Sequence, residues 1–572
     1  MKFIKSWKFS LLVIVLIAGF LRFYQLGNIP AGFLNDEANA GYDAYSLLFT
    51  GRDQWNNFLP VNNFIGFGDF QPPLHRYSSL IPVYIFGLSE FSIRFMSALA
   101  GVLSVAALYF LVKKLINQKA AFFSALLFTV MPWAVGLSRI GHESNLAILF
   151  LIVALFFGLL QKSSKSLFYS VFFLSLSMYT YSAYILYAPL VLTVVLYLNH
   201  KKERGYGHLL KPLILFLIII SPIVFQKNSA SVRFSQVGLT TNINSIGLIN
   251  NLNDERGQCL IIFNPIICKI TDNKGILFTS TFIKNYLSHF SPNFLYINGT
   301  PTQFSILPKR GLDYLFNFLP LIVGVAFFLK NSKQRKLNTA FIILFLLSPL
   351  PDSFTSDGNY TRTSIMQPFL ALFGGLGIYY FLDILKEKKR LRYLFTTLFI
   401  LIISFSSISF FIIYTTYFKN NYSIYSQYGY NDLMKKTYSL KENYDRIYIS
   451  KHLNDTKQYI YYLFYNKYDP SSFQQKEDVD YKTSSDGWVS IDRINNIYFV
   501  QNPPTAKEIK NLAGEKVLVI SNPVDFPKKV RAVFTIKDKL GNVIFEAKDT
   551  SDLLEYERAQ ELLMGVQNAN TN

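Results

Sequence analysis

A succession of long apolar runs constrains the fold of this chain more than any other feature of its sequence. Such runs follow one another through residues 1–417, and most are long enough to cross the ~30 Å hydrocarbon core of a bilayer as a helix. No such run occurs in residues 418–572. The pattern predicts an α-helical polytopic membrane protein with about eleven transmembrane helices and a separate C-terminal domain. The predicted spans are 9–26, 94–112, 120–137, 144–160, 166–181, 183–199, 212–227, 313–329, 337–350, 364–383 and 393–417.

Two apolar stretches need a separate interpretation. The first run follows Met1-Lys2-Phe3-Ile4-Lys5 like a signal peptide, but it continues into Leu21-Arg22-Phe23-Tyr24 without a small-residue cleavage site. We therefore expect an uncleaved first span. Residues 76–88 are apolar but short, and we expect them to form a helix that lies at the membrane surface.

The short connections between the spans predict the orientation. Lys and Arg concentrate in the cytoplasmic loops of membrane proteins. One alternating set of connections carries 21 of these residues, and the opposite set carries few. The bias predicts a multi-pass protein of the cell membrane with a cytoplasmic N-terminus and, after eleven crossings, an extracytoplasmic C-terminal domain.

This orientation places three longer segments outside the membrane. They are a first outer loop at 27–93, a long outer loop at 228–312 and the tail at 418–572. Cys259 and Cys268 both fall in the long outer loop. Because disulfides form in oxidising compartments, we expect these two cysteines to be bonded, with two free thiols as the alternative.

The tail alternates strand-like and helix-like segments. Strands are predicted at 445–450, 497–500, 516–520, 532–536 and 543–545, with an amphipathic helix at 455–467. Leu540-Gly541-Asn542 is typical of a hairpin turn. The alternation predicts a small α/β domain, which could bind an acceptor or cover a site at the membrane.

The charge distribution argues against a nucleic-acid partner. The formal net charge of +20 divides into +19 for residues 1–417 and +1 for the tail. A nucleic-acid-binding protein would present a basic soluble face. The basic residues here belong to the membrane part.

Polar motifs gather in the first outer loop and after the third span. Asn35-Asp36-Glu37-Ala38-Asn39 places two adjacent carboxylates just beyond the first span. Gly68-Asp69-Phe70-Gln71-Pro72-Pro73-Leu74-His75-Arg76-Tyr77 contains a rigid double-proline turn, and residues 91–101 open the second span with small residues that permit close helix packing. Ser138-Arg139-Ile140-Gly141-His142-Glu143 follows the third span. Taken alone, the acidic pair would also suit a solvated loop or a helix cap.

Together these motifs resemble those of the membrane-embedded GT-C glycosyltransferases, family 39 in particular. That family holds the polyprenyl- or dolichyl-phosphate-mannose protein mannosyltransferases and the bacterial aminoarabinose transferase that acts on lipid A. The resemblance in architecture covers residues 1–420, and the motif matches lie at about 30–145. Gln71 stands where some relatives carry a basic residue, and Glu143 stands where many have Asp. The sequence has no Trp-Trp-Asp-Tyr-Gly segment, which argues against an oligosaccharyltransferase catalytic subunit.

The resemblance implies an inverting sugar transferase at the extracytoplasmic face. It would move a sugar, mannose being one option, from a polyprenyl-phosphate donor to a hydroxyl of a protein, glycolipid or glycan. Such a donor carries a good leaving group, so one carboxylate base suffices. The resemblance assigns this base to Asp36, with Glu37 orienting Asp36 or holding a basic partner. Its expected partners are membrane lipids, the donor and the acceptor, and we expect no cofactor and no metal site.

The departing phosphate needs fixed positive charge, which a guanidinium supplies in a planar geometry. An ion pair with Glu143 is the structural alternative for Arg139, an interfacial anchor for Arg94, and a solvated loop charge for Arg362. Gln71, Glu143 and Tyr181 could support the site. The predicted phosphate-binding residues are Arg139, His75, Arg76, Arg362 and Arg94.

Other interpretations remain open at this stage. Tyr181 lies in the aromatic cluster 179–187, which favours an interfacial aromatic belt over a sugar-stacking wall. A non-catalytic lipid or polysaccharide transporter or flippase is the alternative function, and it would require ionisable residues in mid-span and repeat symmetry. A structural assembly factor would depend on residues 418–572 and not on Asp36.

Overall fold

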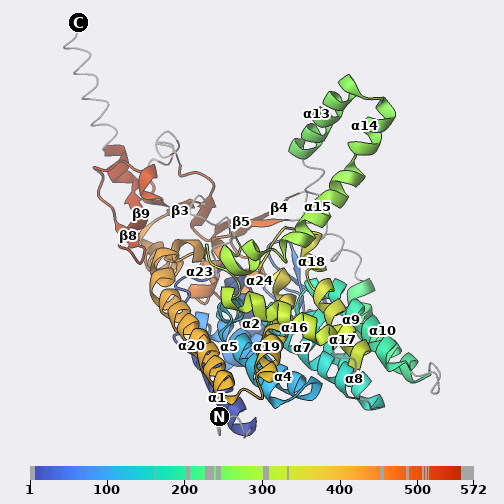
Figure 1. The fold of residues 1–572 in the computed structure, drawn as a ribbon. Coiled ribbons are helices and arrows are strands. Elements are labelled where there is room, and N and C mark those ends of the chain that lie inside the picture. The colour runs from blue at the N-terminus through green and yellow to red at the C-terminus, as the bar shows by residue number, and fades with distance from the viewer. Residues whose placement is uncertain are drawn as a thin grey trace, which may run out of the picture.

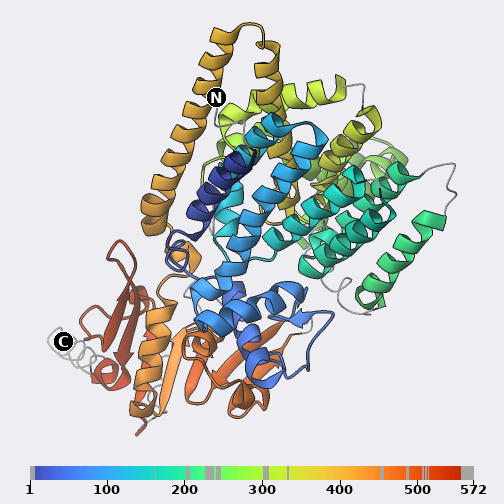
Figure 2. The same ribbon diagram turned by 90° about the horizontal axis from the view of Figure 1, so that it is seen from below.

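The structure, a computed structural model, describes residues 7–161, 163–200, 207–225, 238–239, 246–300, 308–330, 334–450, 457–484, 488–504, 508, 512 and 514–555. A bundle of helices forms the larger part. A β-sheet built from the C-terminal residues lies at one end of this bundle, in the lower part of Figure 2.

Each of the eleven predicted spans overlaps helical residues, so the helical part of the prediction is confirmed. Residues 226–227 of the predicted span 212–227 lie outside the described residues. The helices are α1 (Trp7–Phe23), α4 (Glu90–Leu115), α5 (Gln118–Val130) with α6 (Pro132–Ser138), α7 (Ser144–Leu155) with the π-helix η2 (Phe156–Leu160), α8 (Ser164–Thr180), α9 (Ala183–Asn199), α10 (Gly207–Phe225), α16 (Phe318–Lys330), α17 (Arg335–Leu347), α19 (Gln367–Ile384), and α20 (Lys389–Ile413) with the π-helix η8 (Tyr414–Phe418).

Within the described ranges, three helical segments are long and apolar enough to cross a membrane, namely Glu90–Leu115, Arg362–Ile384 and Lys389–Asn421. Four apolar helices are shorter: Ser144–Leu160, Ala183–Asn199, Gly207–Ile223 and Leu315–Lys330. The predicted span 120–137 is broken, because α5 and α6 meet at an angle of 56°. Pro132 begins α6 and forces Met131 into an extended conformation with ψ 122°, as proline does to the residue before it.

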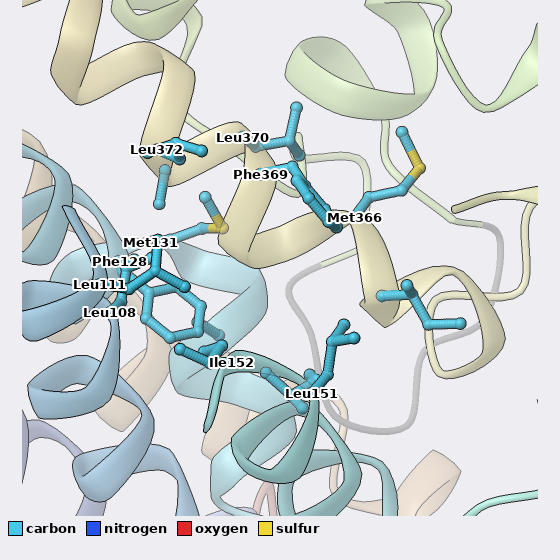
Figure 3. Close-up of a cluster of buried hydrophobic side chains, with 14 of the residues drawn as sticks. Leu108, Leu111, Phe128, Met131, Leu151, Ile152, Met366, Phe369, Leu370 and Leu372 are labelled. Carbon is cyan, nitrogen blue, oxygen red and sulfur yellow. The ribbon is translucent and has the colours of Figure 1, made fainter. Parts of the chain in front are cut away.

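The bundle is held together by a buried apolar core. Figure 3 shows a cluster of these buried side chains, and none of those that it labels is more than 2% exposed. α19 lies inside the bundle, because 83% of the most apolar 18-residue stretch of Arg362–Ile384 is buried. α20 lies at the edge, because only 17% of the corresponding stretch of Lys389–Asn421 is buried. The core side chains drawn include Leu108 and Leu111 of α4, Phe128 of α5, Leu151 and Ile152 of α7, and Phe369, Leu370 and Leu372 of α19.

The first outer loop contains two helices, α2 (Asn35–Thr50) and α3 (Leu74–Phe86), with a short antiparallel pair β1 (Phe64–Ile65) and β2 (Phe70–Gln71) between them. α3 is the short helix expected near 76–88. It buries His75 and Arg76 and exposes Ile81, Tyr84 and Ile85. The polar side chains thus face the protein and the apolar side chains face outward, as expected for a helix that lies at a membrane surface.

Three helices, α13 (Ile246–Ile262), α14 (Pro265–Thr271) and α15 (Lys274–Ser288), occupy the long outer loop. The predicted Cys259–Cys268 disulfide is confirmed. In Figure 1, α13 and α14 stand beyond the end of α15, away from the rest of the molecule.

The tail forms a seven-stranded sheet in the order β4-β5-β6-β3-β7-β9-β8. The central strands β6, β3 and β7 run parallel and the flanking pairs are antiparallel. Every residue of β7 is buried, as expected for a central strand with an unbroken apolar sequence. The strands are β3 (Arg446–Ser450), β4 (Val479–Thr483), β5 (Val489–Ile494), β6 (Ile497–Val500), β7 (Val517–Ser521), β8 (Phe534–Lys537) and β9 (Val543–Asp549).

The predicted strands of the tail are confirmed, and the predicted helix is confirmed in a shorter form, α23 (Tyr459–Tyr465). Residues 455–456 of that prediction lie outside the described residues. The sequence analysis did not predict β4 or β5. Four of the five residues of β4 are exposed at the sheet edge, and β5 buries only two of its six residues. The helices α22 (Tyr430–Leu440) and α24 (Pro470–Gln474) were also missed.

The tail and the first outer loop share one hydrophobic core. Phe33 and Tyr42 pack with Phe464 and Phe473 of the tail. At Gly41 the helices α2 and α23 approach so closely that a Cβ atom would lie 2.6 Å from the Phe464 ring. The sheet domain therefore supports the segment that carries Asp36 and Glu37.

Candidate active site

The two adjacent carboxylates at the start of α2 have opposite environments. Asp36 is exposed, whereas only 2% of Glu37 is accessible. Both lie in the first turn of the helix, where the helix dipole favours negative charge. Glu37 also folds back to accept a hydrogen bond of 3.0 Å from the Leu34 amide, which fixes the start of the helix.

Glu37 holds a buried arginine on the neighbouring span. Its Oε1 accepts from Arg94 Nε at 2.9 Å, and its Oε2 accepts from Arg94 Nη2 at 3.2 Å. The remaining N–H groups of Arg94 donate to the carbonyls of Leu26, Pro30 and Gly32. All five donors of this guanidinium are engaged within the protein. The geometry therefore gives Arg94 a positioning role in place of the predicted phosphate contact, and it gives Glu37 the predicted basic partner.

The same carboxylate ties the turn after α6 to the start of α2. The Gly141 amide donates to Glu37 Oε1 at 2.6 Å. A Cβ atom on residue 141 would lie 2.8 Å from Ile93, so this close approach requires glycine. The contact brings His142 and Glu143 next to the segment that carries Asp36. Glu143 Oε2 lies 3.9 Å from His142 Nδ1.

Arg139 binds the end of the first span. Nη1 donates to the carbonyls of Leu21 and Arg22 at 2.8 and 3.1 Å, and Nη2 donates to Tyr24 and Ile29 at 2.6 and 3.0 Å. The last carbonyls of a helix lack intrahelical partners, and cations stabilise this end. We therefore assign Arg139 to capping the end of α1. Its Nη1 and Nη2 groups bond to these carbonyls, and not to Glu143 as in the structural alternative, so capping takes the place of the predicted phosphate contact.

Arg22 is a buried residue of this region that the sequence did not single out. It donates to the carbonyls of Phe128 and Thr129 at the end of α5 and to Ser138 Oγ at 3.2 Å. A charge within an apolar run is costly unless it is used, and that signal could have identified it. Arg22 and Arg139 together fasten α1 to α5 and to the turn that begins at Ser138.

Arg76 lies in a second buried network beneath α2. Its Nε donates to Asp43 Oδ2 at 2.7 Å, and its Nη2 donates to Asn39 at 2.9 Å and to Gln71 Oε1 at 2.5 Å. Gln71 in turn donates to Asp69 at 3.0 Å. Burial raises the pKa of Asp43, and the adjacent guanidinium opposes this shift. Arg76 therefore joins α3 to α2, and Gln71 joins β2 to Arg76. Sequence reasoning missed Asp43 as the partner of Arg76.

His75 is 2% exposed, and its Nε2 atom has no hydrogen-bond partner among the described residues. Burial lowers the pKa of His75 to about 4, although the nearby Glu143 acts in the opposite direction. The imidazole is therefore neutral at physiological pH. A neutral imidazole can share a hydrogen bond with a substrate, but it cannot balance the charge of a phosphate.

Arg362 keeps more exposure than the other predicted cationic residues. Its side chain is 27% exposed, whereas His75, Arg76, Arg94 and Arg139 are at most 3% exposed. Nη1 donates to Thr355 Oγ1 at 2.9 Å and lies 3.6 Å from Asp352 Oδ1.

Asp352 is the buried centre of the loop that carries Arg362. It accepts from the Asn359 amide at 2.7 Å, from Ser356 Oγ at 2.7 Å and from His289 Nε2 at 2.9 Å. Neither Asp352 nor His289 is accessible to solvent. These bonds fix the loop from 352 to 362 and thereby fix the starting point of the Arg362 side chain.

Tyr181 joins this loop to the turn after α6. Its hydroxyl lies 3.1 Å from Thr361 Oγ1, and its ring meets the His142 ring edge-on at a centroid distance of 5.3 Å. Tyr181, Tyr184 and Tyr187 are 3%, 0% and 0% exposed. The interpretation of these three residues as an aromatic belt facing the membrane is therefore wrong, because they pack inside the bundle.

Two cavities of the described part are lined by none of the predicted site residues. One of about 380 Å³ lies between residues 308–315 and α20, and its lining includes none of the predicted site residues. A polar cavity of about 290 Å³ adjoins Gly32 and Gln427, and Gln427 accepts a hydrogen bond from the Asn35 amide at 2.9 Å. No group of three or more His, Cys, Asp or Glu residues in the described ranges could hold a metal ion. The expectation of a metal-free site stays a prediction.

The structure thus brings Asp36, Glu37, Arg94, Arg139, His142 and Glu143 together around one joint between α1, α2, α4 and the turn after α6. The buried members position this joint. Asp36 differs from them in being exposed, and its carboxylate could accept a proton from a hydroxyl group. Arg362 is the predicted cation best placed to meet an anion from outside.

Comparison with known proteins agrees with this architecture. The family model for dolichyl-phosphate-mannose-protein mannosyltransferases matches residues 70–225. The Bacillus subtilis (strain 168) protein named "Putative mannosyltransferase YkcB" is 29% identical over 146 residues, which span 25% of this chain and 19% of that relative.

A solved structure shows the same fold. Apo ArnT from Cupriavidus metallidurans superposes with a TM-score of 0.51 at 12% identity, over 96% of this chain and 98% of ArnT. The same protein bound to undecaprenyl phosphate matches with a TM-score of 0.49 and 12% identity over 94% and 97%. The predicted GT-C-like fold is confirmed by the match to apo ArnT, and the family-model match agrees with the predicted resemblance.

Proposed function

We propose that this chain, which shares its fold with ArnT, is a membrane glycosyltransferase that moves a sugar from a polyprenyl phosphate to an acceptor hydroxyl outside the membrane. The observation that carries the proposal is the division of labour between the two carboxylates of α2. Glu37 is buried and bonded to Arg94 and Gly141, which leaves the exposed Asp36 as the base. ArnT has been solved with undecaprenyl phosphate, and this adds support for a lipid-linked donor.

In this mechanism, Asp36 accepts the proton of the acceptor hydroxyl as the hydroxyl oxygen attacks the anomeric carbon. The bond from that carbon to the phosphate oxygen breaks, and the polyprenyl phosphate leaves with the electron pair. Attack from the opposite side inverts the configuration of the sugar. The leaving group needs no proton, so one carboxylate is enough.

Arg362 stabilises the negative charge of the departing phosphate. Its loop is fixed by Asp352, and its guanidinium is the most exposed of the predicted cations. His75 contributes no charge, because burial keeps its pKa near 4. The proposal relies on the orientation predicted from the basic connections, in which these groups and the C-terminal domain lie on the outer side, where a lipid-linked donor and an external acceptor would meet.

The test uses full-length protein in nanodiscs with a panel of radiolabelled polyprenyl-phosphate sugars. Label should pass from one donor to a hydroxyl-bearing acceptor, and Asp36→Asn should abolish the transfer without loss of folded protein. Asp552→Asn, which changes an exposed aspartate of the tail, is the matched control and should retain activity. Full activity of Asp36→Asn would refute the mechanism.

A further inference from the structure

The hairpin at the end of α15 exposes an unusual amount of apolar surface for a segment outside the bundle. Its helices α13 and α14 are joined by the Cys259–Cys268 disulfide. At its tip, Leu260, Ile261, Ile262 and Phe263 are 47%, 75%, 77% and 55% exposed. On α14, Ile266 and Ile270 are 67% and 64% exposed. Figure 1 shows this tip standing away from the remaining helices.

The arrangement of these side chains distinguishes between kinds of partner. Successive helical residues are about 100° apart, because a turn contains 3.6 residues. The three consecutive helical side chains from Leu260 to Ile262 are therefore spread over about 200° around the end of α13, and the exposed Phe263 follows directly. A protein groove would require a single apolar stripe, whereas lipid can surround a tip from every side.

Bonds inside the hairpin hold the tip in shape without burying its aliphatic side chains. Cys268 is fully buried by the disulfide and its neighbours. Arg256 of α13 donates to the carbonyl of Asp272 at 2.9 Å, beyond the end of α14. The apolar tip is thus a rigid projection whose exposed surface is available to a partner.

α15 connects the tip to the membrane bundle at a defined level. Tyr286 donates its hydroxyl proton to the Leu346 carbonyl at 2.9 Å, and Asn285 donates to Ser353 at 3.2 Å. Leu346 lies in the last turn of α17, an apolar helix that begins with the basic pair Arg335 and Lys336. The contact therefore lies at the end of α17 opposite to its basic residues. In the predicted orientation, this is where the helix leaves the hydrocarbon region on the outer side.

The side of α15 that faces away from these contacts continues the apolar surface. Ile276, Ile283 and Leu287 are 50%, 50% and 60% exposed, and their spacing of seven and four residues places them on one face of the helix. Between residues 264 and 287 the exposed charges are Lys269, Lys274 and Lys284, with Asp272 as the one acid. Apolar side chains combined with lysines are typical of segments that lie in a membrane surface.

We propose that the disulfide-closed tip and the exposed face of α15 insert into the outer surface of the membrane that holds the bundle. The partner is the lipid surface, which the apolar tip enters while the lysines meet the headgroups. This interaction does not depend on the identity of the donor or of the acceptor. It also reaches the candidate site, because His289 follows α15 directly and bonds to Asp352, which fixes the Arg362 loop. Lipid contact would thereby steady one wall of the site.

The test places a small environment-sensitive fluorescent amino acid at position 262 of the full-length protein in nanodiscs that hold one copy each. Position 524 serves as the matched control, because Val524 is 85% exposed and belongs to the sheet domain. Nanodiscs of phosphatidylcholine and phosphatidylglycerol are prepared with and without doxyl-labelled lipid, and iodide serves as the aqueous quencher.

At position 262 we expect a several-fold loss of fluorescence with doxyl lipid and little quenching by iodide, whereas position 524 should show the reverse. Equal behaviour of the two positions would overturn the proposal. Protection of position 262 from both quenchers would also overturn it, because that result would indicate a protein contact. Neither readout uses sugar transfer, so a failure here is distinguishable from a failure of the proposed function.

Discussion

Replacing Asp36 and Glu37 one at a time by the corresponding amide should have opposite effects. Asp36→Asn should abolish sugar transfer and preserve stability, whereas Glu37→Gln should lower stability. Asp36→Asn removes the proposed base from an exposed position, so the free energy of unfolding should change by no more than ~0.5 kcal/mol. Glu37→Gln leaves the fully buried Arg94 without its counter-charge. Breaking a buried ion pair by removing one partner costs about 3–5 kcal/mol.

The amide at position 37 also creates a conflict between donors. Glu37 accepts hydrogen bonds from Arg94 through both oxygens, from Gly141 and from Leu34. A glutamine has one oxygen and one NH₂ group. The NH₂ group would take the place of one carboxylate oxygen, and it would then face N–H groups that need an acceptor. We therefore expect the loss to reach the upper part of that range.

Thermal unfolding of the purified variants in detergent, followed by tryptophan fluorescence, measures the difference. The double variant Glu37→Gln/Arg94→Met provides the control, because removal of both charges should cost less than the sum of the single changes. Recovery would be partial, since the carbonyls of Leu26, Pro30 and Gly32 lose their donor. If Glu37→Gln unfolded at the wild-type temperature, or if the single changes were additive, the reasoning would be refuted.

Three further outcomes are expected. Because burial lowers the His75 pKa from 6.5 to about 4, stability should fall by up to ~3 kcal/mol as the pH drops through this interval; thermal unfolding should show this loss in the wild type and not in His75→Gln. Arg362→Ala should raise the KM for the donor by roughly 10- to 100-fold with little change in unfolding temperature, with Arg362→Lys in between; an unchanged KM would count against a phosphate contact. Gly41→Ala should cost ~1–3 kcal/mol, because its Cβ would lie 2.6 Å from Phe464, whereas Gly19→Ala, with no atom within 4 Å, should be neutral or stabilising by up to ~1 kcal/mol in thermal unfolding.

Much of the fold could be predicted because apolar runs and alternation are local signals. The helices of the bundle and the strands β3, β6 and β7 follow from uninterrupted apolar segments. The edge strand β4 could not be found this way, since its side chains face solvent. Pro132 causes the bend between α5 and α6. The proline is visible in the sequence, but whether it bends a span depends on tertiary packing, which the sequence alone does not reveal.

The candidate site was predictable in its location but not in its division of roles. Span-end charges identified Arg94 and Arg139, but hydrogen bonds to carbonyls of α1 and the following turn are set by tertiary approach. The partnership of His289 with Asp352 joins residues 63 positions apart, and no spacing rule predicts it. Glu37 and Asp36 are identical in charge and adjacent in sequence, so only the family resemblance distinguished their roles, and the basic partner that it implied for Glu37 is Arg94.

The core shared by the first outer loop and the tail has a consequence for biosynthesis. α2 leaves the ribosome early, but its packing partner α23 follows roughly 400 residues later. At about 5–20 residues per second, the segment that carries Asp36 waits about 20 to 80 seconds for the surface against which it folds. A nascent chain that stops before the tail would hold every span and every predicted site residue and would still lack a supported α2. Completion of the last domain would then act as a checkpoint, because the segment that carries Asp36 is supported only after the tail has been synthesised.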